Sequence, residues 1–314
     1  MKNINTKYGI LEGITSVSYY DNNLIKECTL NKINNIKTPY GIFVPQWDDS
    51  GERRKLTYSI SFHKNGNLKS ISLQNMSYLN TPIGILPAEL ITFYEDESIN
   101  RVFNLNGKIS AYWTEEDECK LADDIEFNLP IGRFRKKTIG IHFYKSGEVK
   151  SITFWPRDKI TIKSPIGNVV TRIGLSFYKN GNLKSFEPSE YICVKTKIGN
   201  ITAYDNNPLG VNGDSNSVRF SIDGEIKSLT TSTDKIEVIL ENGAKKVHQP
   251  QLKPSLLSEG SMEIVPLCIE FYENKVCFDK IYEYFVSDCT FKIEKKILKI
   301  DSSCSNCAGC SGCS

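Results

Sequence analysis

A short motif that recurs along this 314-residue chain limits what the chain can fold into. Each copy has an aromatic residue, then Asn, Asp or Ser followed by Gly, and then Ile, Leu or Val six positions after the aromatic residue; Asn23 replaces the Gly in the first copy. The copies lie at 19–27, 62–70, 103–110, 143–151, 177–185 and 220–228. Apolar residues at alternate positions on either side of an Asn-Gly pair are typical of a β-hairpin. The chain is therefore predicted to be an array of hairpins.

The spacing within the motif favours a three-residue loop. Such a loop places Gly last, in the left-handed conformation that Gly and then Asn tolerate best. In the copy at 143–151, Phe143 then faces Val149 on one side of the sheet. A two-residue turn would instead set Phe143 opposite Lys150, and this alternative stays open because both loops use Asn-Gly.

A second element precedes each hairpin and ends in Gly, as in TPYG, TPIG and SPIG. These glycines are Gly9, Gly41, Gly84, Gly132, Gly167 and Gly199. With the hairpins they define six units, each expected to bury its apolar side against its neighbours. We predict an all-β fold, a repetitive antiparallel β-hairpin array forming an elongated sheet or a β-solenoid-like stack.

The predicted organisation has three parts. Residues 1–229 hold the six units, and residues 230–300 are expected to be degenerate repeats that cap the array, interrupted by a polar linker at 247–260. Residues 301–314 are expected to be a flexible tail. One helical insertion, expected on the sheet edge, is predicted over 114–125, where Thr114 is a candidate N-cap and Asp117 stands at the capping-box position.

The string aromatic-Tyr-Lys-Asn-Gly-x-Leu-Lys-Ser, best seen at 143–151 and 177–185, resembles the variant MORN-type repeat. The resemblance covers about nine residues of each unit. It implies an array of antiparallel hairpins and a role in scaffolding or in protein and lipid contact, and it brings no catalytic residues with it. The units here are longer than MORN units and carry the added Gly-terminated element.

Charge and composition exclude several classes of function. There are 39 Lys and Arg residues against 37 Asp and Glu, so the net charge of +2 gives no overall attraction to DNA or to an anionic membrane. The first residues lack a signal-peptide pattern, which predicts a cytoplasmic protein.

A row of lysines lies next to the apolar hairpin residues, and outward-facing aromatic residues accompany it. The lysines either contact phosphate or lipid or simply keep the surface soluble. The lysines are Lys26, Lys69, Lys150, Lys184 and Lys227, and the aromatic residues are Tyr20, His63, Tyr144 and Tyr178.

The tail CSNCAGCSGCS carries the sharpest chemical signal. Its candidate metal ligands are Cys304, Cys307, Cys310 and Cys313, separated only by small residues. Four thiols at such spacing can converge on Zn or on an iron–sulfur cluster, and they can also crosslink or be modified. The other six cysteines, Cys28, Cys119, Cys193, Cys268, Cys277 and Cys289, are predicted to be packing residues.

No set of catalytic residues emerges from the rest of the sequence. His63 and His142 fall in different units, and His248 falls in the predicted linker. The acidic run from Glu115 to Glu118 is predicted to be the solvated face of the helix. The sequence therefore favours a non-enzymatic scaffold with a protein partner and a Cys-rich tail. The alternative is a redox or iron–sulfur protein that uses the tail.

Overall fold

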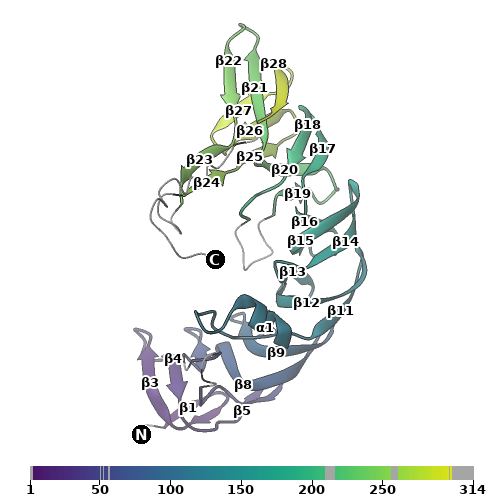
Figure 1. The fold of residues 1–314 in the computed structure, drawn as a ribbon. Coiled ribbons are helices and arrows are strands. Elements are labelled where there is room, and N and C mark those ends of the chain that lie inside the picture. Colours follow the sequence, from purple (N-terminus) through teal and green to yellow (C-terminus); the bar gives the residue numbers. More distant parts are fainter. Residues whose placement is uncertain are drawn as a thin grey trace, which may run out of the picture. The chain divides into compact units, whose positions relative to one another are not determined.

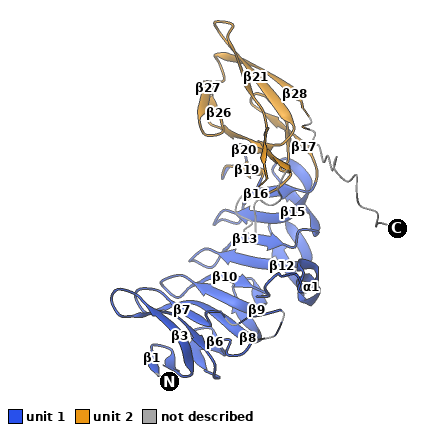
Figure 2. Ribbon diagram, turned by 60° about the vertical axis from the view of Figure 1, so that its left-hand side comes forward, with its two compact units in different colours: residues 1–189, 209–216, 222–224 blue, residues 190–208, 217–221, 225–314 orange. Residues whose placement is uncertain are grey.

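The computed structural model describes residues 3–49, 51, 53–55, 57–208, 216–255, 261–296 and 298. The chain divides into two compact units, the first built mainly from residues 1–189 and the second mainly from residues 190–208 and 225–314 (Figure 2). Almost every described strand pairs antiparallel with the strand before or after it in the chain, and α1 (Glu115–Leu121) is the one helix of the described residues (Figure 1). The predicted all-β array of antiparallel hairpins is confirmed.

The first compact unit contains one antiparallel sheet of ten strands, each pairing with the next. In order across the sheet they are β3 (Ile14–Tyr19), β4 (Ile25–Leu30), β7 (Ile60–Phe62), β8 (Leu68–Thr81), β9 (Gly84–Phe93), β10 (Ile99–Phe103), β12 (Gly132–Phe143), β13 (Val149–Phe154), β15 (Gly167–Phe177) and β16 (Leu183–Pro188). The remaining strands of this unit are β1 (Ile4–Thr6), β2 (Gly9–Leu11), β5 (Ile36–Thr38), β6 (Gly41–Phe43), β11 (Asp124–Leu129) and β14 (Lys159–Ser164).

The second compact unit contains a five-stranded sheet and smaller sheets. The strands are β17 (Ile192–Thr196), β18 (Gly199–Ala203), β19 (Val218–Phe220), β20 (Ile226–Thr231), β21 (Asp234–Leu240), β22 (Lys245–His248), β23 (Gln251–Pro254), β24 (Met262–Val265), β25 (Leu267–Phe271), β26 (Lys275–Phe278), β27 (Tyr282–Phe285) and β28 (Cys289–Lys295). The expected linker at 247–260 was wrong in part, because β22 and β23 run through it.

The predicted three-residue loop is confirmed. Tyr144 and Glu148 pair across the loop, and Phe143 lies opposite Val149. The same register occurs at Tyr19/Ile25, Phe62/Leu68, Phe177/Leu183 and Phe220/Ile226. The last loop residue has positive φ, as in Gly66 at +82° and Asn23 at 61°. Gly and Asn are therefore selected by the backbone conformation.

The predicted copy at 103–110 was wrong. Phe103 pairs with Leu90 and Gly140, and residues 105–110 form no strand. The true hairpin of this unit runs from Phe93 to Ile99, which lie opposite each other. Its left-handed loop residue is Glu97, with φ 68°, so the unit lacks the Gly that marks the other copies.

The second element of each unit is itself a hairpin, which we call the first hairpin because it comes first in the chain. In each, the residue three positions before the Gly lies opposite it, as Thr81 lies opposite Gly84, and at five of the six turns a Thr or Ser hydroxyl donates to the Gly carbonyl. The hydroxyl satisfies a turn carbonyl, which explains the recurring Thr or Ser.

The predicted helix is confirmed over Glu115–Leu121, with Thr114 as N-cap and a complete capping box with Asp117. Its expected place on a sheet edge was wrong. The helix lies between β10 and β11 in the chain, and β10 pairs with both β9 and β12. The insertion therefore sits beside an interior part of the sheet.

Candidate functional site

The four predicted metal ligands, Cys304, Cys307, Cys310 and Cys313, lie outside the described residues. Elsewhere in the described chain, no group of three or more His, Cys, Asp or Glu side chains is arranged to hold a metal ion. The six other cysteines are free thiols. Burial raises the pKa of Cys28 to about 12, which suits a packing residue and suppresses its thiolate. Cys193 differs from that expectation, since it is exposed.

The predicted outward aromatic face serves largely to join neighbouring units. Tyr20 donates to the carbonyl oxygen of Phe62 at 2.8 Å, Tyr94 to that of Phe143 at 2.8 Å, and Tyr144 to that of Phe177 at 2.9 Å. His63 occupies the same position and lies 3.0 Å from the carbonyl oxygen of Phe93. Each contact connects one hairpin to the equivalent hairpin of the next unit.

A lysine of the following loop lies over three of these tyrosine rings. Lys64 lies 5.9 Å from the centroid of Tyr20, Lys145 5.5 Å from that of Tyr94, and Lys179 5.6 Å from that of Tyr144. Cation–π contacts of this kind add modest stability at exposed sites. The lysines predicted as a row are exposed or half-buried, and two of them also approach a tyrosine: Lys150 at Tyr144 and Lys184 at Tyr178.

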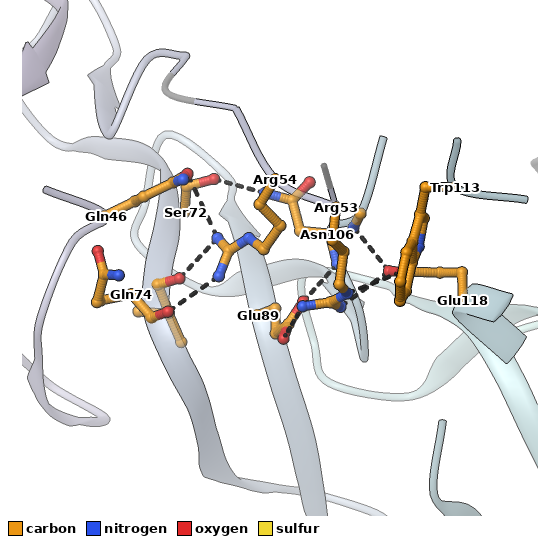
Figure 3. Close-up of polar contacts among 11 residues, drawn as sticks. Gln46, Arg53, Arg54, Ser72, Gln74, Glu89, Asn106, Trp113 and Glu118 are labelled. Carbon is orange, nitrogen blue, oxygen red and sulfur yellow. Dashed lines mark hydrogen bonds and ion pairs between the residues drawn. The ribbon is translucent and has the colours of Figure 1, made fainter. Parts of the chain in front are cut away.

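The densest polar cluster is buried and was not predicted from the sequence. Arg53 makes paired hydrogen bonds to Glu89 at 3.0 and 2.7 Å, and to Glu118 at 2.8 and 2.9 Å (Figure 3). Glu118 also accepts from the indole Nε1 of Trp113 at 2.6 Å and from the backbone N–H of Gly107 at 2.7 Å. Every carboxylate oxygen in the cluster is therefore satisfied.

A second arginine completes the charge balance of this region. Arg54 is 3% exposed and donates to the backbone carbonyls of Leu73 and Gln74 at 2.7 and 3.0 Å. Burial lowers the pKa of Arg54, whereas the bonds of Arg53 to Glu89 and Glu118 outweigh burial and raise the pKa of Arg53. The charges of Arg53 and Arg54 therefore balance those of Glu89 and Glu118, and the carboxylate oxygens accept hydrogen bonds from within the protein. The cluster joins the segment before β7, strand β9 and helix α1, and it is a structural clamp.

The clamp corrects one prediction about the acidic run. Glu115 and Glu116 lie on the exposed face of α1, as expected. Glu118 is 3% exposed and points into the clamp. One signal was available: Glu118 lies four residues before Ala122, which is 4% exposed, and therefore on the same face of the helix.

Exposed isoleucines mark the first hairpins of units 1 to 3. Ile10, Ile42 and Ile85 each follow the turn Gly directly and are 58%, 64% and 65% exposed. Tyr78, 67% exposed, adjoins Ile85 in a hollow of about 390 Å³ whose rim carries Asp124 and Arg135. We call Ile10, Ile42, Tyr78 and Ile85 the isoleucine face. In the next three units the equivalent position is polar: Arg133, Asn168 and Asn200.

His248 lies in an aromatic cluster of the second compact unit. Its ring stacks on Phe278 with centroids 4.3 Å apart, and its Nε2 lies 2.9 Å from the hydroxyl of Tyr284. Burial lowers the pKa of His248, which favours the neutral imidazole. Tyr282 and Tyr284 line the adjacent open hollow. The sequence placed this histidine in a linker, so its partners were missed.

Comparisons with known proteins give no relative: no family model, curated protein or solved structure matches this chain. No helix of the described residues is both long and apolar enough to cross a membrane.

Proposed function

We propose that the chain is a non-enzymatic β-hairpin repeat scaffold that binds a protein partner through the isoleucine face. The carrying observation is that Ile10, Ile42 and Ile85 stand at equivalent positions of three successive units and are each more than half exposed. Exposed large apolar side chains are typical anchors of protein–protein interfaces. The resemblance of the hairpins to variant MORN-type repeats supports the same role.

The units themselves provide the test. Replacing the three isoleucines by Asn copies the residue that units 5 and 6 carry at this position, so the combination Ile10→Asn, Ile42→Asn and Ile85→Asn should preserve the fold. A matched control replaces three exposed isoleucines elsewhere, Ile33, Ile109 and Ile281, which are 63%, 59% and 71% exposed.

The expected result is a partner recovered by quantitative pull-down with the wild type and with the control. With the triple variant of the isoleucine face, the amount of partner recovered should fall by at least about tenfold, since truncating a few central apolar anchors removes most of the binding energy. Equal recovery by the two triple variants would reject the face as the binding surface.

We further propose that the tail adds soft-metal binding to the scaffold. Four thiols with two small residues between neighbours match the ligand number of tetrathiolate Zn and iron–sulfur sites. Metal analysis of the intact chain against a chain ending at Ser303 tests this, with about one equivalent of metal lost on truncation. Equal metal content in the two chains would contradict it.

The alternative proposal, a redox or iron–sulfur protein, makes a different prediction. Anaerobic purification would then give a coloured protein that contains iron, whereas zinc binding or thiol modification gives a colourless one. Visible absorbance and iron content separate the two.

A further inference from the structure

Two residue rows cross the sheet of the first compact unit from strand to strand, one on each face. The apolar row takes one residue from each of the ten strands: Val17, Cys28, Ile60, Ile71, Ile91, Val102, Ile141, Ile152, Leu175 and Phe186. The polar row is its neighbour along each strand: Ser18, Glu27, Ser61, Ser70, Thr92, Arg101, His142, Ser151, Ser176 and Ser185.

The apolar row is incompletely covered at one end. Its nine members from Cys28 to Phe186 are each at most 1% exposed. Val17, on strand β3, is only half-buried. Among the described strands, β3 pairs with β4 alone, and Figure 1 shows it at the outer side of the first compact unit.

The later units show what the position of β3 accepts. The strands that correspond to β3 in three later units are β7, β12 and β15. Each pairs antiparallel with the last strand of the preceding unit: β7 with β4, β12 with β10, and β15 with β13. The register of β3 with β4 shifts near both of its ends, and so does that of β12 with β13, yet β12 pairs on both sides. These irregularities therefore do not prevent pairing at β3.

Strand β3 also lacks the usual protection of an edge. Its six residues, Ile-Thr-Ser-Val-Ser-Tyr, include no charged residue and no proline. Natural proteins commonly place Lys or Pro on such a strand because free backbone N–H and C=O groups otherwise recruit another strand.

We propose that β3 is a self-association edge, which pairs antiparallel with β3 of a second copy of this chain about a two-fold axis at Val17. In this register Val17 lies opposite the partner's Val17 and extends the apolar row. Ser18 lies opposite the partner's Ser16, repeating the Ser61–Ser70 and Ser176–Ser185 pairs, whose hydroxyls are 2.5 Å apart.

The sequence on either side of β3 is compatible with this register. Asp21 would lie opposite the partner's Gly13, and Glu12 opposite the partner's Asn22, so no two like charges oppose each other. An isologous interface must be self-complementary in this way. A second copy continues the antiparallel pairing, the apolar row and the polar row with residues already present, which is why it is the occupant we favour over an unrelated peptide.

Light scattering coupled to size-exclusion chromatography of the full chain tests the proposal. The mass should rise with protein concentration from 35.5 kDa toward twice that value. Val17→Lys places two ammonium groups at the two-fold axis and should weaken dimerisation by at least about tenfold. Ser16→Lys places a lysine opposite the partner's Ser18 on each side of the axis, at an exposed position. It decides the question if Val17→Lys does not fold.

The control is Ile109→Lys, which adds the same charge at an exposed isoleucine outside both β3 and the isoleucine face and should leave dimerisation unchanged. Circular dichroism confirms that each variant keeps its β structure. A wild type that stays monomeric at all concentrations overturns the proposal, and so does a dimer that Ser16→Lys leaves intact. Binding of the partner protein at the isoleucine face is a separate readout, so either proposal can fail alone.

Discussion

At the scale of single residues, buried charge explains how the irregular segments are held. Arg53, which is 65 residues from Glu118 in the chain, brings the segment before β7 against helix α1. Glu97 acts similarly at a hairpin loop, where its carboxylate lies 2.5 Å from Lys7 and accepts from Tyr8 at 2.6 Å. These bonds lower the pKa of Glu97 and offset the cost of its left-handed backbone.

Replacing Arg53 by Ala should destabilise the protein by about 3–5 kcal/mol, because Glu89 and Glu118 would remain buried without a counter-ion. Urea unfolding monitored by circular dichroism measures the change. The control, Arg133→Ala, removes a side chain that is 75% exposed and pairs with Glu126, and it should cost no more than about 1 kcal/mol. Similar losses for the two variants would contradict a structural role for the clamp.

The buried His248 predicts a pH dependence of stability. Its pKa is lowered in the folded protein, so the unfolded chain binds the proton more readily. The stability it contributes is therefore present above the unfolded pKa of about 6.5 and is lost as the pH falls below it. His248→Phe keeps an apolar ring against Phe278 and removes the titration. Between about pH 7 and pH 5.5 the wild type should lose more stability than this variant; parallel melting curves would contradict the assignment.

At the scale of elements, local sequence explains the hairpins well. The three-residue loop, its register and the capped helix all follow from turn and capping chemistry within a few residues. The hairpin at Phe93–Ile99 was missed because Glu97 takes the left-handed position through contacts with Lys7 and Tyr8, about 90 residues earlier in the chain. Local pattern cannot reveal support of that kind.

Two loop glycines separate backbone strain from packing. Gly66 has φ +82° and open space where the methyl group of an alanine would lie, whereas a methyl group at Gly147, φ +99°, would lie 3.0 Å from Cγ of Pro82. Gly66→Ala should therefore cost about 1 kcal/mol from backbone conformation alone. Gly147→Ala should cost more, because it adds a contact with the first hairpin of the preceding unit. Thermal unfolding of both variants measures the difference, and equal losses would show that this contact is unimportant.

At the scale of the whole molecule, each sheet is assembled from strands that pair mainly with near neighbours in the chain. Repeat proteins built in this way respond locally to damage, since each unit depends on the next one for its stability. Coupling between distant parts then weakens with the number of intervening units.

Amide hydrogen exchange should therefore respond locally to Arg53→Ala. We expect faster exchange in β8, β9 and α1, which adjoin the clamp, and unchanged exchange in β25–β28 of the second compact unit. Acceleration spread evenly over both compact units would indicate one cooperative structure instead.

The sequence by itself determined the class of fold and the helix cap, and it favoured the correct loop type and register, because each depends on residues only a few positions apart. It also singled out the cysteines at 304–313, whose role stays a prediction. Tertiary structure decided the rest. Three features depend on side chains that are distant in the chain: the hydrogen bonds of the outward tyrosines between units, the burial of Glu118 beside Arg53, and the surroundings of His248. Only folding brings these groups within bonding distance.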